Sequence, residues 1–297
     1  MKALNDLNMD HKKSMALLVC YYGKLPWYFS YFVHSCGFNP SIDFYILTDD
    51  ESYTSPMPGN VKLIYKTIDE ISTLAAEKLG FEVSIKYPYK LCDFKPAYGF
   101  VFSDILGKYD FWGHCDIDVI FGNIRDFMTD ELLDNHDVIS VRADWLTGCF
   151  LLFRNVLKVN TLFLHSKDYQ KVFSTPRHYC FDETNFKHHA FTDGKAYHEI
   201  ESEIESMTHV VKKMEAENYI KPYFDLHIIE GGSPGNLIWD DGKLIYKNKF
   251  EVLLYHLIDF KRHYVLKKMN PFIPDRFTIS PTKIYHKPKS KIIPNEI

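Results

Sequence analysis

Three short apolar runs near the start of the chain predict the first strands of a sheet. They are "SMALLVCYYG", "DFYILTDD" and "VKLIYK". The first two are near-continuous apolar runs, which are typical of strands that are buried on both faces. The second run ends with Thr48, Asp49 and Asp50. We therefore expect a parallel sheet that is covered by helices.

A helix is predicted directly after these strands. Residues 67–70, Thr-Ile-Asp-Glu, have the form of a capping box, and Gly80 is a typical end of a helix. Apolar residues keep helical spacing between these two signals; they are Ile68, Ile71, Leu74, Ala75 and Leu79.

The stretch "YPYKLCDFKPAYGFVFSDILGKYDF" predicts a further helix, with Asp93 near its N-terminus, Pro96 in its first turn and Gly107 at its end. It leads into "KYDFWGHCDIDVIFGN", which predicts a strand whose carboxyl end carries Asp116 and Asp118. Open parallel sheets bind ligands beyond the carboxyl ends of their strands. The two aspartates therefore lie where a site is expected.

The second half of the chain continues the alternation of strands and helices. "DVISVRADWLTGCFLLFRN" predicts two strands around a polar break, and residues 169–191 predict a loop that ends in helical signals. "IESEIESMTHVVKKMEAENY" predicts a charged helix with a solvated acidic face. "NLIWDDGKLIY" predicts a hairpin with Asp241 and Gly242 in a type I′ turn.

The composition fits one large α/β domain. The chain has 297 residues, of which 46% are hydrophobic and 16% aromatic, so it has material for a large core. We expect this domain over residues 15–270, between an N-terminal tail (1–14) and a basic C-terminal tail (271–297). The C-terminal tail carries Lys283, Lys287, Lys289 and Lys291. A weak contact with an anionic membrane surface is one interpretation of the tail, and a solvated, disordered end is the other.

Charge and cysteine content narrow the classes of function. A net charge of −4 gives no general attraction for nucleic acid. The six cysteines form no C-x-x-C pair, which favours reduced thiols in a cytoplasmic protein and argues against structural zinc. No run approaches the roughly 18 apolar residues of a membrane span.

Asp116 and Asp118 need partners in their apolar surroundings. An ionised carboxylate costs several kcal/mol to bury unless it is paired, hydrogen-bonded or bound to a metal. A divalent cation prefers such hard oxygen ligands. The alternative is that the two carboxylates cap the next helix or accept hydrogen bonds from backbone amides.

The order of motifs resembles the nucleotide-sugar glycosyltransferases of the GT-A fold. It runs from an apolar strand through "ILTDD", a helix with a basic and an acidic residue, the D-x-D triplet, "TGCFLLF" and "DE" to a late histidine. The likeness covers about residues 15–265. It is greatest to retaining families such as the glycogenin-like and blood-group-transferase-like enzymes, and to bacterial surface-polysaccharide transferases. It implies an α/β fold with a GT-A-type, Rossmann-like mixed sheet, helices on both faces and small C-terminal hairpin and helical elements.

The resemblance also implies a metal site. Asp116 and Asp118 would hold Mn²⁺, or Mg²⁺, that bridges the two phosphates of a UDP-sugar. "YHLIDFKRHY" resembles the late His-rich motif of glycogenin-like enzymes, so His256 would be the third ligand, with Lys261 and Arg262 at the phosphates. The motif departs from the family form, because an aspartate follows where glycine is usual and no Pro-Trp follows. A structural histidine is the alternative for His256.

"CFDETNF" resembles the "DE" element of blood-group-like transferases, which implies Asp182 and Glu183 as catalytic residues near the anomeric carbon. Their charge would stabilise an oxocarbenium-like centre or supply a nucleophile in a retaining reaction. The alternative is a helix N-terminus at the surface.

The remaining site residues follow from the same likeness. Those implied to contact the donor are Tyr21, Tyr22, Gly23, Thr48, Asp49, Lys90, Asp93 and Lys95, although core packing is an alternative for the tyrosines. "DWLTGCF" places Trp145, Thr147 and Gly148 near the acceptor, because rings stack on sugar faces and glycine permits close approach.

The expected function is metal-dependent, retaining transfer of a hexose from a UDP-sugar to a hydroxyl of a glycan or lipid-linked glycan. Two alternatives remain. "CDIDVIFGN" also resembles the nucleophile motif of haloacid-dehalogenase-type phosphohydrolases, but that motif normally opens the fold and has Gly where Val119 stands here. A non-catalytic sugar-nucleotide or glycan-binding module is the other, although it needs neither the late histidine nor the "DE" element.

Overall fold

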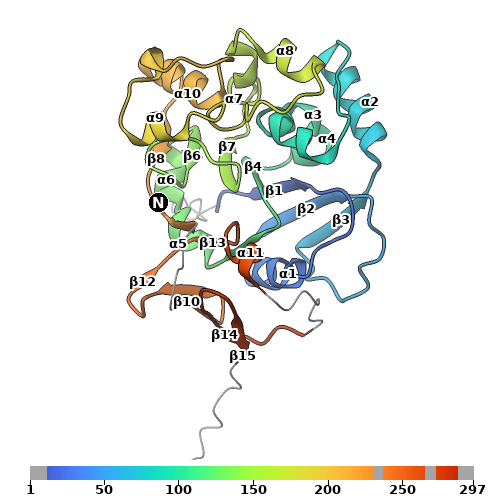
Figure 1. Cartoon of the computed structure of the whole chain (residues 1–297), viewed down its shortest axis with the longest axis vertical. Helices are drawn as coiled ribbons and strands as arrows, with labels where there is room; N and C mark the ends of the chain where they lie inside the picture. Colours follow the sequence, from blue (N-terminus) through green and yellow to red (C-terminus); the bar gives the residue numbers. More distant parts are fainter. Residues whose placement is uncertain (1–11, 231–236, 265–271, 287–297) are drawn as a thin grey trace, which may run out of the picture.

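The three early apolar runs form adjacent strands at one side of a seven-stranded sheet (Figure 1). A computed structural model describes residues 12–230, 237–264 and 272–286. The strand order is β3-β2-β1-β4-β7-β6-β8, and β7 runs antiparallel to both of its neighbours. The other pairs in this sheet are parallel. The strands are β1 Met15–Cys20, β2 Ile42–Thr48, β3 Val61–Tyr65, β4 Phe111–Cys115, β6 Val138–Ser140, β7 Phe150–Arg154 and β8 Pro222–Phe224.

Helices cover both faces of this sheet. The α-helices of the described ranges are α1 Phe29–Gly37, α2 Ile68–Leu79, α3 Tyr98–Val101, α4 Ser103–Leu106, α5 Ile124–Phe127, α6 Asp130–Asn135, α7 Leu157–Asn160, α8 Tyr169–Ser174, α9 His188–Thr192, α10 Met207–Ala216 and α11 Phe260–His263. Three short 3₁₀ helices join them: η1 Pro88–Ala97, η2 Leu162–His165 and η3 Tyr197–Glu199. No helix in the described ranges is long and apolar enough to cross a membrane.

The side chains of β1 alternate between two cores. Ala16 and Leu18 pack in one core with α2 and α10, whereas Met15, Leu17 and Val19 pack in the other with α1. Because both faces are covered, the strand needs a continuous apolar sequence. The expected α/β fold class, with a mixed sheet and helices on both faces, is confirmed.

The predicted start and end of α2 are confirmed. The Glu70 amide donates to Thr67 Oγ1 at 3.2 Å, and the Thr67 amide donates to Glu70 Oε2 at 2.7 Å, which completes the capping box. Gly80 ends the helix at a φ of +77°, in the left-handed region that favours glycine.

The single helix predicted from residue 93 to residue 107 is wrong. The segment is divided into η1, α3 and α4, and Pro96 lies inside η1 instead of in the first turn of an α-helix. Proline lacks an amide hydrogen and prevents a regular α-helix around it. Asp93 does not cap a helix, because its carboxylate accepts hydrogen bonds from the amides of Tyr179 and Phe181.

The predicted hairpin belongs to a second sheet at the C-terminal end. Its order is β12-β11-β10-β14-β15, with β10 Leu237–Asp240, β11 Lys243–Tyr246, β12 Phe250–Glu251, β14 Arg276–Ile279 and β15 Ile284–His286. Asp241 and Gly242 have φ angles of +46° and +87°, as a type I′ turn requires. β14 and β15 lie in the segment predicted as a basic tail, and Phe277 and Ile279 are buried against the hairpin. Residue 271 and residues 287–297, with Lys287, Lys289 and Lys291, lie outside the described residues.

A third, three-stranded sheet connects the two larger ones. It consists of β5 Val119–Phe121, β13 Leu254–His256 and β9 Ile228–Glu230, with β13 in the middle. His256 is paired in register with Val119 on one side and with Glu230 on the other. This pairing brings the late histidine beside the D-x-D segment.

Candidate active site

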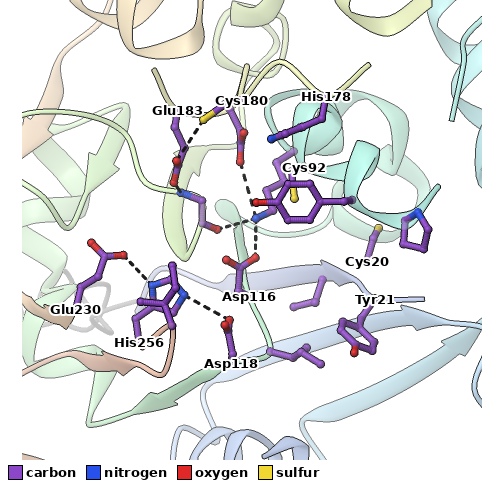
Figure 2. A pocket seen from close by; sticks show the side chains of 18 of the residues that line it. Cys20, Tyr21, Cys92, Asp116, Asp118, His178, Cys180, Glu183, Glu230 and His256 are labelled. Carbon is purple, nitrogen blue, oxygen red and sulfur yellow. Dashed lines mark hydrogen bonds and ion pairs between the residues drawn. The ribbon is translucent and has the colours of Figure 1, made fainter. Parts of the chain in front are cut away.

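A cavity of about 630 Å³ lies beyond the carboxyl ends of β1 and β4 (Figure 2). Eleven of the eighteen predicted site residues line it: Tyr21, Tyr22, Lys95, Asp116, Asp118, Trp145, Gly148, Asp182, Glu183, His256 and Lys261. These residues come from distant parts of the chain, and the antiparallel β7 contributes through the loop that precedes it. The cavity therefore unites the D-x-D, "DE" and late-histidine motifs.

Asp116, Asp118 and His256 form a group of side chains that could hold a cation. One ligand atom from each lies within 4.8 Å of the others. Asp118 and His256 are each only 7% exposed. The Leu257 amide donates to the Asp118 carbonyl oxygen at 2.8 Å, which fixes the end of β13 to the D-x-D turn.

Two lysines neutralise the carboxylates of the D-x-D triplet. Lys95 Nζ donates to Asp116 Oδ1 at 2.6 Å, and Lys261 Nζ donates to Asp118 Oδ2. Burial raises the pKa of the Asp116 carboxyl, and Lys95 opposes this effect. Burial acts in the same direction on Asp118, but His256 and Lys261 outweigh it and hold the pKa of Asp118 below its usual value.

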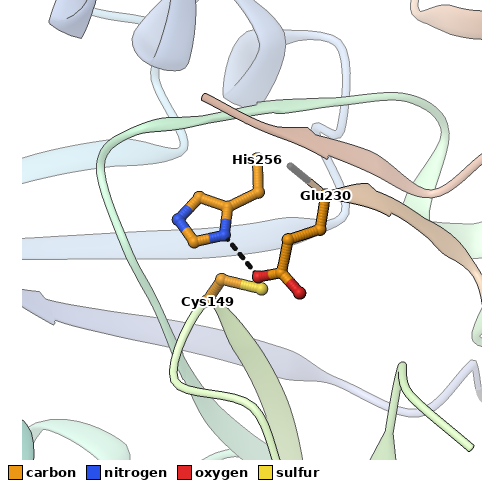
Figure 3. Close-up of side chains that lie close together, drawn as sticks. All are labelled: Cys149, Glu230 and His256. Carbon is orange, nitrogen blue, oxygen red and sulfur yellow. Dashed lines mark hydrogen bonds and ion pairs between the residues drawn. The ribbon is translucent and has the colours of Figure 1, made fainter. Parts of the chain in front are cut away.

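Glu230 orients His256 from the neighbouring strand. Figure 3 shows the His256 ring beside the Glu230 carboxylate, where Nδ1 lies 2.7 Å from Oε1. The other ring nitrogen, Nε2, lies 3.5 Å from Asp118 Oδ1. Arg142 donates to the second oxygen of Glu230 at 2.9 Å, so the carboxylate is itself held. A metal-binding histidine commonly has such a carboxylate partner at its second nitrogen.

The donor set fits a divalent cation. Two carboxylate oxygens and one imidazole nitrogen suit Mn²⁺ and, through the oxygens, Mg²⁺. Burial alone would lower the pKa of His256, but Cys149, Asp118 and Glu230 raise it well above its usual value. A cation at this position would therefore displace a proton from the imidazole.

Lys90 and Asp93 do not line the cavity, in contrast to their expected contact with the donor. Both side chains are fully buried, and Lys90 Nζ donates to Asp93 Oδ2 at 2.8 Å and to the carbonyl oxygens of Val172 and Arg177. The Asp93 carboxylate in turn accepts hydrogen bonds from backbone amides of the 177–183 loop. The pair thus holds the loop that carries the "DE" element.

Five further predicted residues also lie outside the cavity lining. Asp49 accepts a hydrogen bond from the Gly23 amide at 2.7 Å, so both shape the turn after β1. Thr48 is buried and its hydroxyl accepts from the Asp50 amide. Thr147 is buried with its Oγ1 2.8 Å from Cys149 Sγ. The Arg262 side chain is 69% exposed and pairs with Asp259 at 3.3 Å.

Asp182 and Glu183 lie in the cavity wall with different electrostatics. Burial raises the pKa of Asp182 well above its usual value, against the effect of Lys95. Burial also acts on Glu183, but hydrogen bonds from His188 and the Gly148 amide lower the pKa of this carboxyl. These bonds measure 2.8 Å and 2.6 Å. Burial therefore shifts Asp182 toward the protonated form, whereas the hydrogen bonds shift Glu183 toward the ionised form.

Gly148 permits a close approach of three charged side chains to the backbone. Lys95 Nζ donates to its carbonyl oxygen at 2.9 Å, while its amide binds Glu183. A Cβ atom at this position would lie 3.0 Å from Asp182 Oδ2 and 3.2 Å from Lys95 Nζ. The glycine is therefore part of the cavity wall, and its predicted contact with an acceptor stays a prediction.

A family model described as a family of unknown function (DUF6625) matches residues 17–288 of the chain. The chain belongs to this family. A comparison with curated proteins gave no match. Among solved structures, the galactosyltransferase LgtC in complex with donor and acceptor sugar analogs matches with 10% identity and a TM-score of 0.34, over 73% of this chain and 76% of that one.

Several cavity residues of this DUF6625 chain were missed by sequence reasoning. Glu230 follows a short apolar pair but is not part of a motif, and its role is visible only through the pairing of β9 with β13. His188 lies five positions after Glu183, and only the structure shows that they interact. Tyr28 and Tyr89 also line the cavity, although aromatic residues are too common in this chain to be singled out.

Proposed function

We propose that this protein is a metal-dependent glycosyltransferase that moves a hexose from a UDP-sugar to a hydroxyl of a glycan or lipid-linked glycan. The observation that carries the proposal is the group formed by Asp116, Asp118 and His256 in a cavity that also presents Lys95 and Lys261. A diphosphate needs such a combination of a cation site and basic side chains.

The residues around the cation site have distinct roles in this proposal. Asp116, Asp118 and His256 would hold Mn²⁺ or Mg²⁺. A bound cation offsets the negative charge that develops on the departing diphosphate. Lys261 would exchange its contact with Asp118 for one with a phosphate oxygen. The rings of Tyr21 and Tyr28, which line the cavity, would pack against the nucleoside.

Asp182 and Glu183 would act at the hexose. The ionised Glu183 carboxylate would stabilise positive charge at the anomeric carbon, and a protonated Asp182 would donate a hydrogen bond to a sugar hydroxyl. Retention of configuration fits this arrangement, because a carboxylate then faces the reacting carbon. Trp145, 7% exposed at the cavity wall, would pack against the acceptor.

Thermal unfolding with UDP and Mn²⁺ tests the proposal. If both bind one site, the two together are expected to raise the melting temperature by several degrees and each alone much less. Saturation at about 100 times the joint Kd adds about 2.7 kcal/mol to the free energy of unfolding. Asp118→Asn should abolish the joint shift, whereas Asp104→Asn, at a side chain that is 78% exposed, should keep it.

A panel of UDP-sugars, assayed for metal-dependent hydrolysis or transfer, then identifies the donor. A melting temperature that does not respond to UDP with Mn²⁺, or an Asp118→Asn variant with the full shift, would contradict the proposal. Turnover of phosphate esters without UDP-sugar turnover would favour a phosphohydrolase.

A further inference from the structure

Cys180, Glu183 and His188 bring a sulfur, a carboxylate oxygen and an imidazole nitrogen together in the cavity wall. Cys180 Sγ lies 3.4 Å from Glu183 Oε2 and 3.9 Å from His188 Nε2. His188 Nε2 and Glu183 Oε2 are 2.8 Å apart. All three residues line the cavity, and Figure 2 shows the Cys180 sulfur directed at the Glu183 carboxylate.

These separations resemble those in the coordination shell of a tetrahedral zinc ion. With the usual Zn–S, Zn–N and Zn–O bond lengths, the ligand atoms of such a site lie about 3.4 to 3.6 Å from one another. The two distances to Cys180 Sγ agree with this range to within a few tenths of an ångström. The His188–Glu183 distance is shorter because a hydrogen bond, which an ion would replace, joins the two atoms.

We propose that Cys180, Glu183 and His188 form a zinc site whose fourth coordination position faces the cavity. Sulfur and imidazole ligands favour Zn²⁺ over Mn²⁺ and Mg²⁺. A thiolate and a carboxylate together offset the two charges of the ion, so a neutral group is placed in the buried wall. The Cys180 thiol releases its proton to solvent as the Zn–S bond forms, and no oxidation state changes.

A second group with a thiol lies at the other side of the D-x-D segment. Cys149, Glu230 and His256 also have ligand atoms within 4.8 Å of one another (Figure 3). Cys149 is only 2% exposed and does not line the cavity. Its sulfur already contacts Thr147. Entry of an ion from the cavity therefore favours the site at Cys180.

Occupancy of the Cys180 site would inhibit the protein, a consequence that rests on the proposed function. The ion would hold Glu183 Oε2, while Oε1 remains bound to the Gly148 amide. Neither oxygen would then be available to the anomeric carbon. Zn²⁺ is therefore expected to inhibit sugar transfer even when Mn²⁺ saturates the D-x-D site.

Cobalt binding to the protein without nucleotide tests the site itself. Co²⁺ occupies tetrahedral zinc sites, and a thiolate bound to Co²⁺ gives a near-ultraviolet charge-transfer band that oxygen and nitrogen ligands do not give. The wild-type protein is expected to show this band with one equivalent of Co²⁺ and to lose it when Zn²⁺ is added. Cys180→Ser should abolish the band, whereas Cys149→Ser and the cavity control Cys20→Ser should keep it.

His188→Gln gives a second measure that leaves the thiol intact. Its Co²⁺ affinity should fall at least about tenfold, since even indirect partners of a metal change affinity by 10- to 100-fold. The melting temperature of each metal-free variant checks that it is folded. If Cys180→Ser does not fold, the Co²⁺ affinity of His188→Gln decides whether the zinc site exists.

Three results separate the zinc site from the proposed function. The absence of a band in the wild type, or a band that is lost in Cys149→Ser and kept in Cys180→Ser, overturns the zinc site. A protein that shows the band but neither binds UDP with Mn²⁺ nor turns over a UDP-sugar keeps the zinc site and loses the proposed function. Joint binding of UDP and Mn²⁺ without a cobalt band keeps the proposed function and overturns the zinc site.

Discussion

Glu230 orients the imidazole ring of His256. Its carboxylate holds Nδ1 of His256 and directs Nε2 toward Asp118. We predict that Glu230→Gln weakens Mn²⁺ binding by about 10- to 100-fold, because an amide holds the imidazole less firmly than a carboxylate does. Titration of Mn²⁺, followed by its electron paramagnetic resonance signal, measures the change.

The exposed Glu77 provides the control for this substitution, since it lies on α2. Glu77→Gln should bind Mn²⁺ as the wild type does. Equal affinities for Glu230→Gln and the wild type would show that Glu230 has no part in cation binding.

Glu183 makes contacts that a glutamine of the same shape would keep only in part. If its charge stabilises the anomeric centre, Glu183→Gln should lower kcat at least about 100-fold while the joint affinity for UDP and Mn²⁺ changes little. Steady-state kinetics and a thermal shift measure the two effects. Glu201→Gln, at an exposed position, is the matched control. Loss of nucleotide affinity along with kcat would instead indicate a structural role.

Single residues of the cavity could be predicted from the sequence where neighbouring residues formed a motif. Asp116 and Asp118 were predicted because they follow a buried strand, and His256 because of a local likeness. Lys90 and Asp93 were predicted to contact the donor, but they pair with each other and with backbone groups of the protein. A charged residue in a sequence does not disclose whether its partner is a substrate or a backbone amide.

At the scale of elements, η1 and the 177–183 loop depend on one buried ion pair. Asp93→Asn leaves the fully buried Lys90 without its counter-charge. We predict a loss of about 3 to 5 kcal/mol in the free energy of unfolding, measured by urea denaturation. The pair Lys78–Asp104, with side chains 30% and 78% exposed, offers the contrast.

Asp104→Asn should cost less than about 1 kcal/mol, because surface ion pairs contribute little. Similar losses in the two variants would mean that the 177–183 loop does not need the buried pair.

Elements that are defined by local signals were predicted well. The capping box and Gly80 marked the limits of α2, and a near-continuous apolar run marked β1, which is buried almost throughout. The segment around Pro96 was predicted wrongly, because long-range contacts of Asp93 determine the backbone there. The pairing of β14 with β10 was also missed, since no local pattern identifies a distant strand as a partner.

At the scale of the whole molecule, buried histidines link stability to pH. Burial lowers the pKa of His209 below 6.5, and its ring lies among buried residues of α10. The unfolded chain therefore binds a proton at this residue below pH 6.5 that the folded protein does not bind, and stability falls as the pH drops from 6.5 toward the folded-state pKa.

We predict that His209→Gln loses less stability between pH 7.5 and pH 5.5 than the wild type does. Urea unfolding at the two pH values measures the difference for each protein. Equal losses would show that His209 is protonated equally in both states.

The order of the strands could not be derived from the sequence. The alternation of helices and strands predicted a parallel sheet, and only the family resemblance implied a mixed one. The position of the antiparallel β7 between β4 and β6 depends on packing of the whole chain. This position brings Gly148 to the cavity, because an antiparallel strand begins at the edge where its parallel neighbours end.

The small sheet of β5, β13 and β9 has a consequence for synthesis of the protein on the ribosome. Asp118 and Lys261 are 143 positions apart, and contacts of such separation form late because loop closure costs entropy. A nascent chain that ends before β13 would contain Asp116 and Asp118 without His256, the third ligand in the proposed cation site. Tight Mn²⁺ binding by stalled chains of increasing length should therefore begin only when residue 256 has left the exit tunnel, well after the first five strands of the large sheet can pair.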